Sequence, residues 1–239
     1  PLYTYRSLLQ QSPTNRERSA LWNGSKSTTV VVAGGGATAC ELSQSLARLG
    51  IQNITIVAPS LLPTEDVSLQ QAAHEILQRD GVQFRLGCRV ETILPCQNND
   101  INSKKARIQL DTGEILDCDA FLVCIGRTPD LKDLHLGKAN ISWDNSTGVH
   151  VNSYLQSKTA GHVYACGDCA SAVPKRDRRA IHAGWMGFHA VRNMAIGKLG
   201  FLGKVLLREP AIHPAVPRVV YTDPELASIG LSYAECIAK

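Results

Sequence analysis

Residues 162–171, with the sequence HVYACGDCAS, contain two cysteines, Cys166 and Cys169, separated by two residues. Two thiols at this spacing can form a redox-active dithiol, or supply two of the four ligands of a tetrahedral zinc site. The chain has no second Cys-x-x-Cys pair to complete such a zinc site. Alternatively, the chemistry belongs to Gly167 and Asp168 between the cysteines. The elements around the segment decide between these interpretations.

A second chemical motif lies at 34–39, where the spacing is G-x-G-x-x-A. Before it, 28–33 (TTVVVA) form a β-branched run typical of a strand buried on both faces of a parallel sheet. After it, 37–50 predict a helix that ends at a Gly50 cap, with one apolar face made by Leu42, Leu46 and Leu49. Residues 53–58 (NITIVA) predict the next strand, so the segment forms a β-α-β unit with a right-handed crossover.

In this context the motif is the fingerprint of dinucleotide binding. The first glycine permits a tight turn, the second lets the pyrophosphate approach the backbone, and the small third residue allows close helix–strand packing. The free N–H groups and the dipole of the helix N-terminus attract the phosphates. An ordinary glycine-rich turn is the alternative. The candidate nucleotide-binding residues are Gly34, Gly35, Gly36, Ala37, Thr38 and Ala39.

The end of the second strand bears on the choice of nucleotide. A carboxylate there would bind the ribose 2′-OH of NAD, and a nearby arginine would bind the 2′-phosphate of NADP. The strand ends Val57-Ala58-Pro59-Ser60, which contains neither. Because the missing carboxylate removes a repulsion toward phosphate, we expect a weak preference for NADPH.

Farther along the chain, the pattern predicts a helix at 67–81, a strand at 82–87, a hairpin at 107–119 and a buried strand at 120–126. In a second region, the pattern predicts short strands at 148–157 and 162–168 and a helix at 181–197. An alternating antiparallel segment follows at 219–232, and a capping box at Ser232–Glu235 opens a further helix.

Composition excludes several classes of protein. The 239 residues are 44% hydrophobic, which supports a packed core, and no apolar run approaches the ~20 residues of a membrane helix. The net charge is +4, and the basic run 175–179 has no interleaved aromatic residue, so a solvated loop is favoured over a nucleic-acid site. The eight cysteines, with Cys40 and Cys124 in apolar segments, favour a soluble intracellular protein, in the cytoplasm or an organelle.

Four segments in order, 30–44, 123–130, 159–171 and 221–232, resemble the flavoprotein pyridine nucleotide–disulfide oxidoreductases. The likeness runs from about Thr28 to the end of the chain. It implies an α/β, Rossmann-like FAD/NAD(P)-binding fold, present in part, followed by the start of an α+β dimerisation domain. The implied order begins with a linker at 1–27 and an NAD(P)-binding domain at 28–125. The C-terminal part of an FAD-binding domain follows at 126–200, and the beginning of a dimerisation domain at 201–239.

The resemblance also implies roles for single residues. Asp168, with Gly167, matches the position that accepts a hydrogen bond from the ribityl chain of FAD, so the two cysteines would flank a flavin site. The helix opened by 180–185 matches the segment whose amides face the flavin, where His182 either touches the flavin region or packs in the core. Gly126 matches the loop that contacts the nicotinamide nucleotide. Glu41 matches a position near the nicotinamide end, and its alternative is an ordinary helix-surface carboxylate.

Taken together, the resemblance implies a fragment of an FAD-dependent oxidoreductase. It would pass hydride from NAD(P)H to FAD and on to a disulfide or metal-type acceptor, as a homodimer when full-length. The first FAD-binding glycine motif and the C-x-x-x-x-C pair of the family would lie before Pro1, and its His–Glu pair after Lys239, so we assign no catalytic residue and no metal ligand here. The alternative is a nucleotide-binding flavoprotein without disulfide chemistry, serving regulation or electron transfer.

Overall fold

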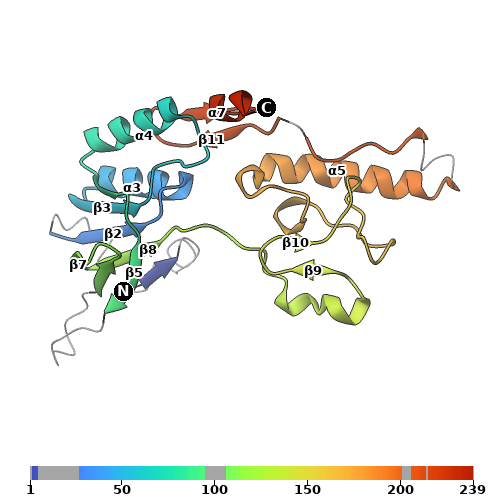
Figure 1. Ribbon diagram of the computed structural model, residues 1–239, viewed down its shortest axis with the longest axis horizontal. Coiled ribbons are helices and arrows are strands. Elements are labelled where there is room, and N and C mark those ends of the chain that lie inside the picture. Colours follow the sequence, from blue (N-terminus) through green and yellow to red (C-terminus); the bar gives the residue numbers. More distant parts are fainter. Residues whose placement is uncertain (1, 5–26, 95–105, 201–205, 214, 239) are drawn as a thin grey trace. The chain divides into compact units, whose positions relative to one another are not determined.

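The structure is a computed structural model that describes residues 2–4, 27–94, 106–200, 206–213 and 215–238 (Figure 1). The chain divides into two compact units. The first comprises Pro1–Gly126, Val219–Ala227 and Ser232–Lys239, and the second comprises Arg127–Arg218 and Ser228–Leu231. The sequence also suggests a short helix near 7–11, within the segment expected to be a linker, and this stretch lies outside the described residues. The predicted domain boundaries stay predictions.

A five-stranded parallel sheet forms the centre of the first unit, with the order β1-β8-β2-β3-β4. The strands are β1 Leu2–Thr4, β2 Thr29–Ala33, β3 Asn53–Ala58, β4 Gln83–Leu86 and β8 Ala120–Val123. This parallel sheet confirms the predicted α/β class. Two of its features were not expected: β1 lies in the segment predicted as a linker, and it pairs with β8.

Both faces of this sheet are covered, which is why its strands read as continuous apolar runs. Helices α3 (Ala37–Arg48) and α4 (Val67–Arg79) pack with Val30, Val32 and Ile56 on one face. Val31, Val57 and Phe121 pack on the other face with a three-stranded antiparallel sheet. That sheet consists of β5 Val90–Leu94, β6 Ala106–Leu110 and β7 Ile115–Cys118. The predicted hairpin is β6–β7, whereas β5 was not predicted.

The buried face of α3 differs from the predicted leucine stripe. Leu46 is buried, but Leu49 is 52% exposed, so its predicted place on the apolar face is wrong. The helix ends at Arg48, and Leu49 is its C-cap, beyond the last helical turn. Gly50 follows with a φ of +101°, the left-handed conformation expected after a helix end. The buried face is instead made by Ala39, Cys40, Ser43, Gln44 and Leu46.

The second unit has few regular elements apart from the long helix α5, Ala180–Gly197, which confirms the helix predicted at 181–197. Its apolar core includes Leu155, Met186 and Ala190. The remaining elements are short 3₁₀ turns and two paired strands: η1 Lys132–Leu134, η2 Leu136–Ala139, β9 Trp143–Asp144, β10 Gly148–Val149, η3 Gly167–Cys169 and η4 Lys175–Asp177.

The strands predicted at 148–157 and 162–168 are therefore mostly wrong. They reduce to β10 and isolated bridges, one of which joins Gln156 to Tyr164. The physical reason is local. The Asn152 side-chain oxygen accepts hydrogen bonds from the backbone N–H groups of Tyr154 and Gln156, at 3.0 and 3.1 Å, and this bends the chain into a turn.

The last described elements are β11 (Arg218–Val220) and β12 (Leu226–Ser228), which form a two-stranded sheet, and α7 (Tyr233–Ile237). The capping box is confirmed: Ser232 Oγ accepts from the Glu235 N–H at 3.3 Å, and the Ser232 N–H donates to Glu235 Oε2 at 2.9 Å. Within the described part of the chain, no helix is long and apolar enough to cross a bilayer.

Candidate functional site

Gly34 and Gly35, the first two residues of the G-x-G-x-x-A motif, are glycines that the fold requires. Gly34 follows β2 with a φ of +115°, a conformation that L side chains rarely adopt, and a Cβ there would collide with the Cys124 carbonyl. A Cβ on Gly35 would collide with the Ser60 carbonyl. The turn is held by the Gly34 N–H, which donates to the Val57 carbonyl at 2.8 Å.

Gly36 differs from these two because the fold itself does not require a glycine there. Its φ is −77°, which any residue adopts, and a Cβ would meet no atom within 4 Å. Gly36 is the N-cap of α3, and no side chain caps this end. The first N–H groups of the helix, on Ala37 and Thr38, have no intrahelical partner. The arrangement leaves open space in front of an uncapped, electropositive helix end.

Ala39 holds this helix end against the sheet. It is fully buried, in the core cluster that also contains Val32 and Ile56. A larger side chain would push α3 away from β2 and displace the N–H groups of its first turn. The small residue therefore has the packing role that the fingerprint predicts.

The strand order places the motif at a topological switch point. From β2, the sheet continues through β3 and β4 on one side and through β8 and β1 on the other. Gly34 follows the carboxyl end of β2, and Gly126, with a φ of +124°, lies just beyond the carboxyl end of β8. In open α/β sheets, ligands bind in the crevice at the carboxyl ends of the strands where the order reverses.

The segment after β3 carries no cation to bind a 2′-phosphate. Ala58 is buried at the strand end, and no lysine or arginine occurs in 49–78. The acidic residues of the connection to α4 are Glu65 and Asp66. Asp66 Oδ1 accepts a hydrogen bond from the Tyr233 N–H at 2.8 Å, so this carboxylate has a structural partner.

Glu41, one turn into α3, has a partner that the sequence did not indicate. Its Oε1 accepts a hydrogen bond from the Tyr221 N–H at 3.0 Å. Two further residues of α3, Gln44 and Arg48, contact Asp223 of the same distant segment. Sequence reasoning missed these contacts. The signal was the spacing of Glu41, Gln44 and Arg48, which places three polar side chains on one helix face.

The Gly167-Asp168 pair forms the start of η3, in the second unit. Gly167 is buried with a φ of +72°, and a Cβ there would lie 3.0 Å from the Ala183 Cβ, so the turn packs directly on the first turn of α5. The Asp168 carboxylate has no hydrogen-bond partner among the residues that the structure describes. A carboxylate without a partner in such a turn is able to accept a hydrogen bond from a ligand hydroxyl.

Of the two cysteines beside this turn, Cys169 has the features of a protonated thiol. Cys166 is extended but does not lie in a strand, which corrects the prediction for this residue, and the Cys169 S–H donates to the Cys166 carbonyl at 3.2 Å. Burial first, and then the charge of Cys166, raise the pKa of the Cys169 thiol above its ordinary value. A reactive thiol needs a lowered pKa. This chemistry disfavours a nucleophilic dithiol and favours the interpretation centred on Asp168.

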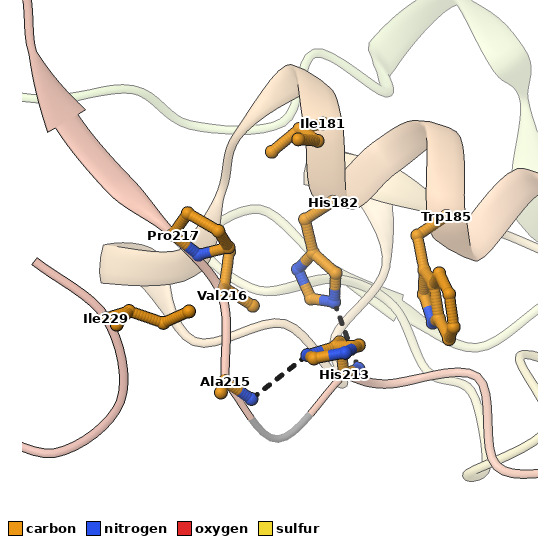
Figure 2. Close-up of a pocket in the computed structure, with 8 residues that line it drawn as sticks. All are labelled: Ile181, His182, Trp185, His213, Ala215, Val216, Pro217 and Ile229. Atoms are coloured by element: carbon orange, nitrogen blue, oxygen red, sulfur yellow. Dashed lines mark hydrogen bonds between the residues drawn. The ribbon is translucent and has the colours of Figure 1, made fainter.

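His182 is buried on the first turn of α5, and both of its ring nitrogens contact the backbone. Nε2 accepts from the His213 N–H at 3.3 Å, which leaves the proton on Nδ1, 3.1 Å from the Asp177 carbonyl. These contacts support a packing role for His182. Figure 2 shows it beside a cavity of about 230 Å³, lined by Ile181, His182, Trp185, His213, Ala215, Val216, Pro217 and Ile229.

Comparison with known proteins identifies the family. The sequence pattern of the pyridine nucleotide-disulphide oxidoreductases matches residues 8–187, three quarters of the chain. This chain belongs to that family. Dihydrolipoyl dehydrogenase of Bacillus subtilis (strain 168) is 31% identical over 208 residues, which are 86% of this chain and 40% of that protein. Glutathione reductase of Burkholderia cepacia is 28% identical over 207 residues, which are 86% of this chain and 42% of that protein.

Solved structures of the family show the same fold. The HOCl-induced flavoprotein disulfide reductase RclA from Escherichia coli superposes with a TM-score of 0.71 at 21% identity, covering 100% of this chain and 48% of that one. The predicted Rossmann-like fold is thus confirmed. The chain spans less than half the length of the curated relatives described above.

Proposed function

We propose that this chain is the nucleotide-binding part of an FAD-dependent NAD(P)H oxidoreductase of the disulfide reductase class. The whole protein would pass hydride from NAD(P)H to FAD and on to a disulfide or metal-type acceptor, as a homodimer. The observation that carries the proposal is Gly36, a glycine that the fold does not need, at the uncapped N-terminus of α3 and at the switch point of a parallel sheet.

In this proposal each residue of the motif has a separate role. Gly34 and Gly35 shape the turn, and Gly36 leaves room for the pyrophosphate. The N–H groups of Ala37 and Thr38 donate to its oxygens, with the helix dipole adding attraction for negative charge. Gly126 lies beyond the neighbouring strand end, where the nicotinamide half of the dinucleotide would extend, and Glu41 lies one turn along α3.

The flavin half of the proposal rests on the second unit. Asp168 has a free carboxylate suited to a ribityl hydroxyl, and Gly167 brings its turn against the first turn of α5. No side chain caps the N-terminus of α5, whose dipole would stabilise negative charge on a neighbouring ring. A bound flavin would supply two-electron redox chemistry. The residues of this chain would bind and orient it.

The direct test is a titration of the purified chain with NADH and NADPH, followed by nucleotide fluorescence. We expect saturable binding, and we expect Gly36→Val to weaken it at least tenfold, because the isopropyl group occupies the space of the pyrophosphate. Gly126→Ala tests a second proposed nucleotide contact, beyond the end of the neighbouring strand β8. Undiminished affinity in a folded Gly36→Val protein, or no binding by the unmodified chain, contradicts the proposal.

A further inference from the structure

Three polar residues on one face of α3 contact a segment about 180 positions later in the sequence. Glu41, Gln44 and Arg48 are spaced three and four residues apart, so they stand above one another on the helix. The segment that they contact runs from Tyr221 to Asp223, directly after β11. Both sides belong to the first unit.

Gln44 is the centre of this contact and is only 4% exposed. Its Oε1 accepts from the Asp223 N–H at 2.8 Å, while its Nε2 donates to the Asp223 carbonyl at 3.0 Å. The same Nε2 donates to Asp80 Oδ2 at 2.8 Å. The amide pairs with both backbone groups of one residue, as a neighbouring strand would. Only one orientation of the amide satisfies these bonds, because the reverse places donor against donor.

Arg48 completes the contact at the edge of the cluster. Its Nη1 lies 2.6 Å from Asp223 Oδ2, and its Nη2 donates to the Asp223 carbonyl at 3.2 Å. Its Nε lies 2.9 Å from Asp80 Oδ2, the oxygen that also accepts from Gln44. Asp80, at the end of α4, therefore ties the two side chains of α3 together.

The Tyr221 N–H and the Asp223 N–H, two residues apart, both point toward side chains of α3. With the Asp223 N–H on Gln44, the Tyr221 N–H donates to Glu41 Oε1 at 3.0 Å. Glu41 Oε2 has no hydrogen-bond partner among the described residues. One carboxylate oxygen is thus held by the protein and the other is left to bind something else.

We infer that Gln44 is a positioning residue of the nucleotide site: by clamping Asp223 it holds the Tyr221 N–H on Glu41 and so orients the free carboxylate oxygen toward the nicotinamide nucleotide. The inference rests on the proposed function. It adds that the segment after β11, far from the glycine motif in sequence, is a working part of the nucleotide-binding unit.

The test is a double-mutant cycle between Gln44→Met and Glu41→Gln, read as the dissociation constants of NADH and NADPH from the purified chain. Methionine keeps an unbranched side chain of similar size and removes the amide. Ile108→Val is the matched control, since it deletes a buried methyl group from the antiparallel sheet, which packs on the face of the parallel sheet opposite α3. Thermal unfolding of all variants shows how much of any effect is lost stability.

We expect Gln44→Met to raise the dissociation constant about threefold to tenfold, the size of one lost hydrogen bond. In the Glu41→Gln background the same change should add less than twofold, and Ile108→Val should leave affinity unchanged. An equal effect of Gln44→Met in both backgrounds would show a structural role only and overturn the inference. Unchanged affinity in Gln44→Met, with Gly36→Val still impaired, overturns it while the proposed function stands. No nucleotide binding by the unmodified chain overturns both.

Discussion

Gly34 and Gly36, two residues apart, are glycines for different physical reasons. Gly34 has a left-handed φ and faces the Cys124 carbonyl, so it serves the fold. Gly36 has an ordinary φ and faces open space, so the fold does not require a glycine there. A glycine that stability does not explain is a candidate for ligand binding. Substitutions at Gly34 and Gly36 can therefore separate an effect on folding stability from an effect on nucleotide binding.

We expect Gly34→Ala to lower the free energy of unfolding by about 2 kcal/mol or more, because it combines a strained φ with a backbone collision. Gly36→Ala should lower the free energy of unfolding by no more than about 1 kcal/mol, the cost of an alanine N-cap, and still weaken NADH binding. Urea unfolding and nucleotide titration of the two variants measure both quantities. A Gly36→Ala protein as unstable as Gly34→Ala would mean that the third glycine is structural.

Three buried or half-buried thiols of the first unit make stability depend on pH in the alkaline range. Burial raises the pKa of Cys40 to about 12 and the pKa values of Cys118 and Cys124 to about 11, from an ordinary value near 9. Their contribution to stability is present below about pH 9 and is lost as pH rises through the folded pKa values, because the unfolded thiols ionise first.

We therefore expect a Cys118→Ala, Cys124→Ala protein to lose less free energy of unfolding between about pH 8 and about pH 10 than the unmodified chain. Alkylation mapped by mass spectrometry at about pH 8 gives a second measurement: Cys236, which is exposed, should react before Cys40 and Cys118, which are buried. Rapid modification of Cys40 in the folded chain would contradict the burial argument.

At the scale of elements, we expect the end of β3 to govern the choice of nucleotide. The strand ends at Ala58, followed by Pro59 and Ser60, so no carboxylate that selects NAD stands at this end, and 59–66 contain no cation for the 2′-phosphate of NADP. We expect NADPH to bind somewhat more tightly than NADH, with a ratio of dissociation constants below tenfold. Parallel titrations of the chain settle the ratio. A preference for NADH of tenfold, about 1.4 kcal/mol, would contradict the expectation.

The turn η3 and helix α5 give a second prediction at this scale. In a flavin-containing full-length protein, a Cys166→Ala, Cys169→Ser double variant should keep its flavin and its NAD(P)H-dependent dye reduction, because Asp168 and the start of α5 carry the proposed site. Flavin content by absorbance and dye-reduction rate are the measurements. Retained flavin with lost turnover toward a disulfide or metal acceptor would assign a catalytic role to the cysteines.

At the scale of the whole molecule, we expect the 239-residue chain to bind NAD(P)H but to hold no FAD tightly. Asp168 and the α5 N-terminus are only part of the proposed flavin site, and the chain spans 40% of the length of the dihydrolipoyl dehydrogenase described above. The checks are a visible absorption spectrum of the purified chain and an NADPH-dependent dye-reduction assay. A yellow protein with dye-reductase activity would show that the chain is a flavoenzyme on its own.

The sequence alone determined the central elements of the first unit, although not β1 or β5. Buried parallel strands consist of β-branched runs, and a glycine motif between a strand and a helix has a local physical cause, so β2, α3, β3 and the nucleotide fingerprint follow from short stretches of sequence. The family could also be predicted from the sequence, because four separated motifs in one order are far more specific than any single motif. Local chemistry likewise predicted the capping box of α7.

Only the tertiary structure decided which glycines serve the fold, that His182 is satisfied by backbone groups, and that Gln44 and Arg48 hold Asp223. These facts depend on contacts between residues up to 180 positions apart, which no local period encodes. The prediction of strands around Cys166 was wrong for a related reason. Their apolar residues pack in an irregular core, and the Asn152 side chain replaces ladder hydrogen bonds with a turn. Where side chains rather than strand partners satisfy the backbone, alternation in sequence no longer predicts a sheet.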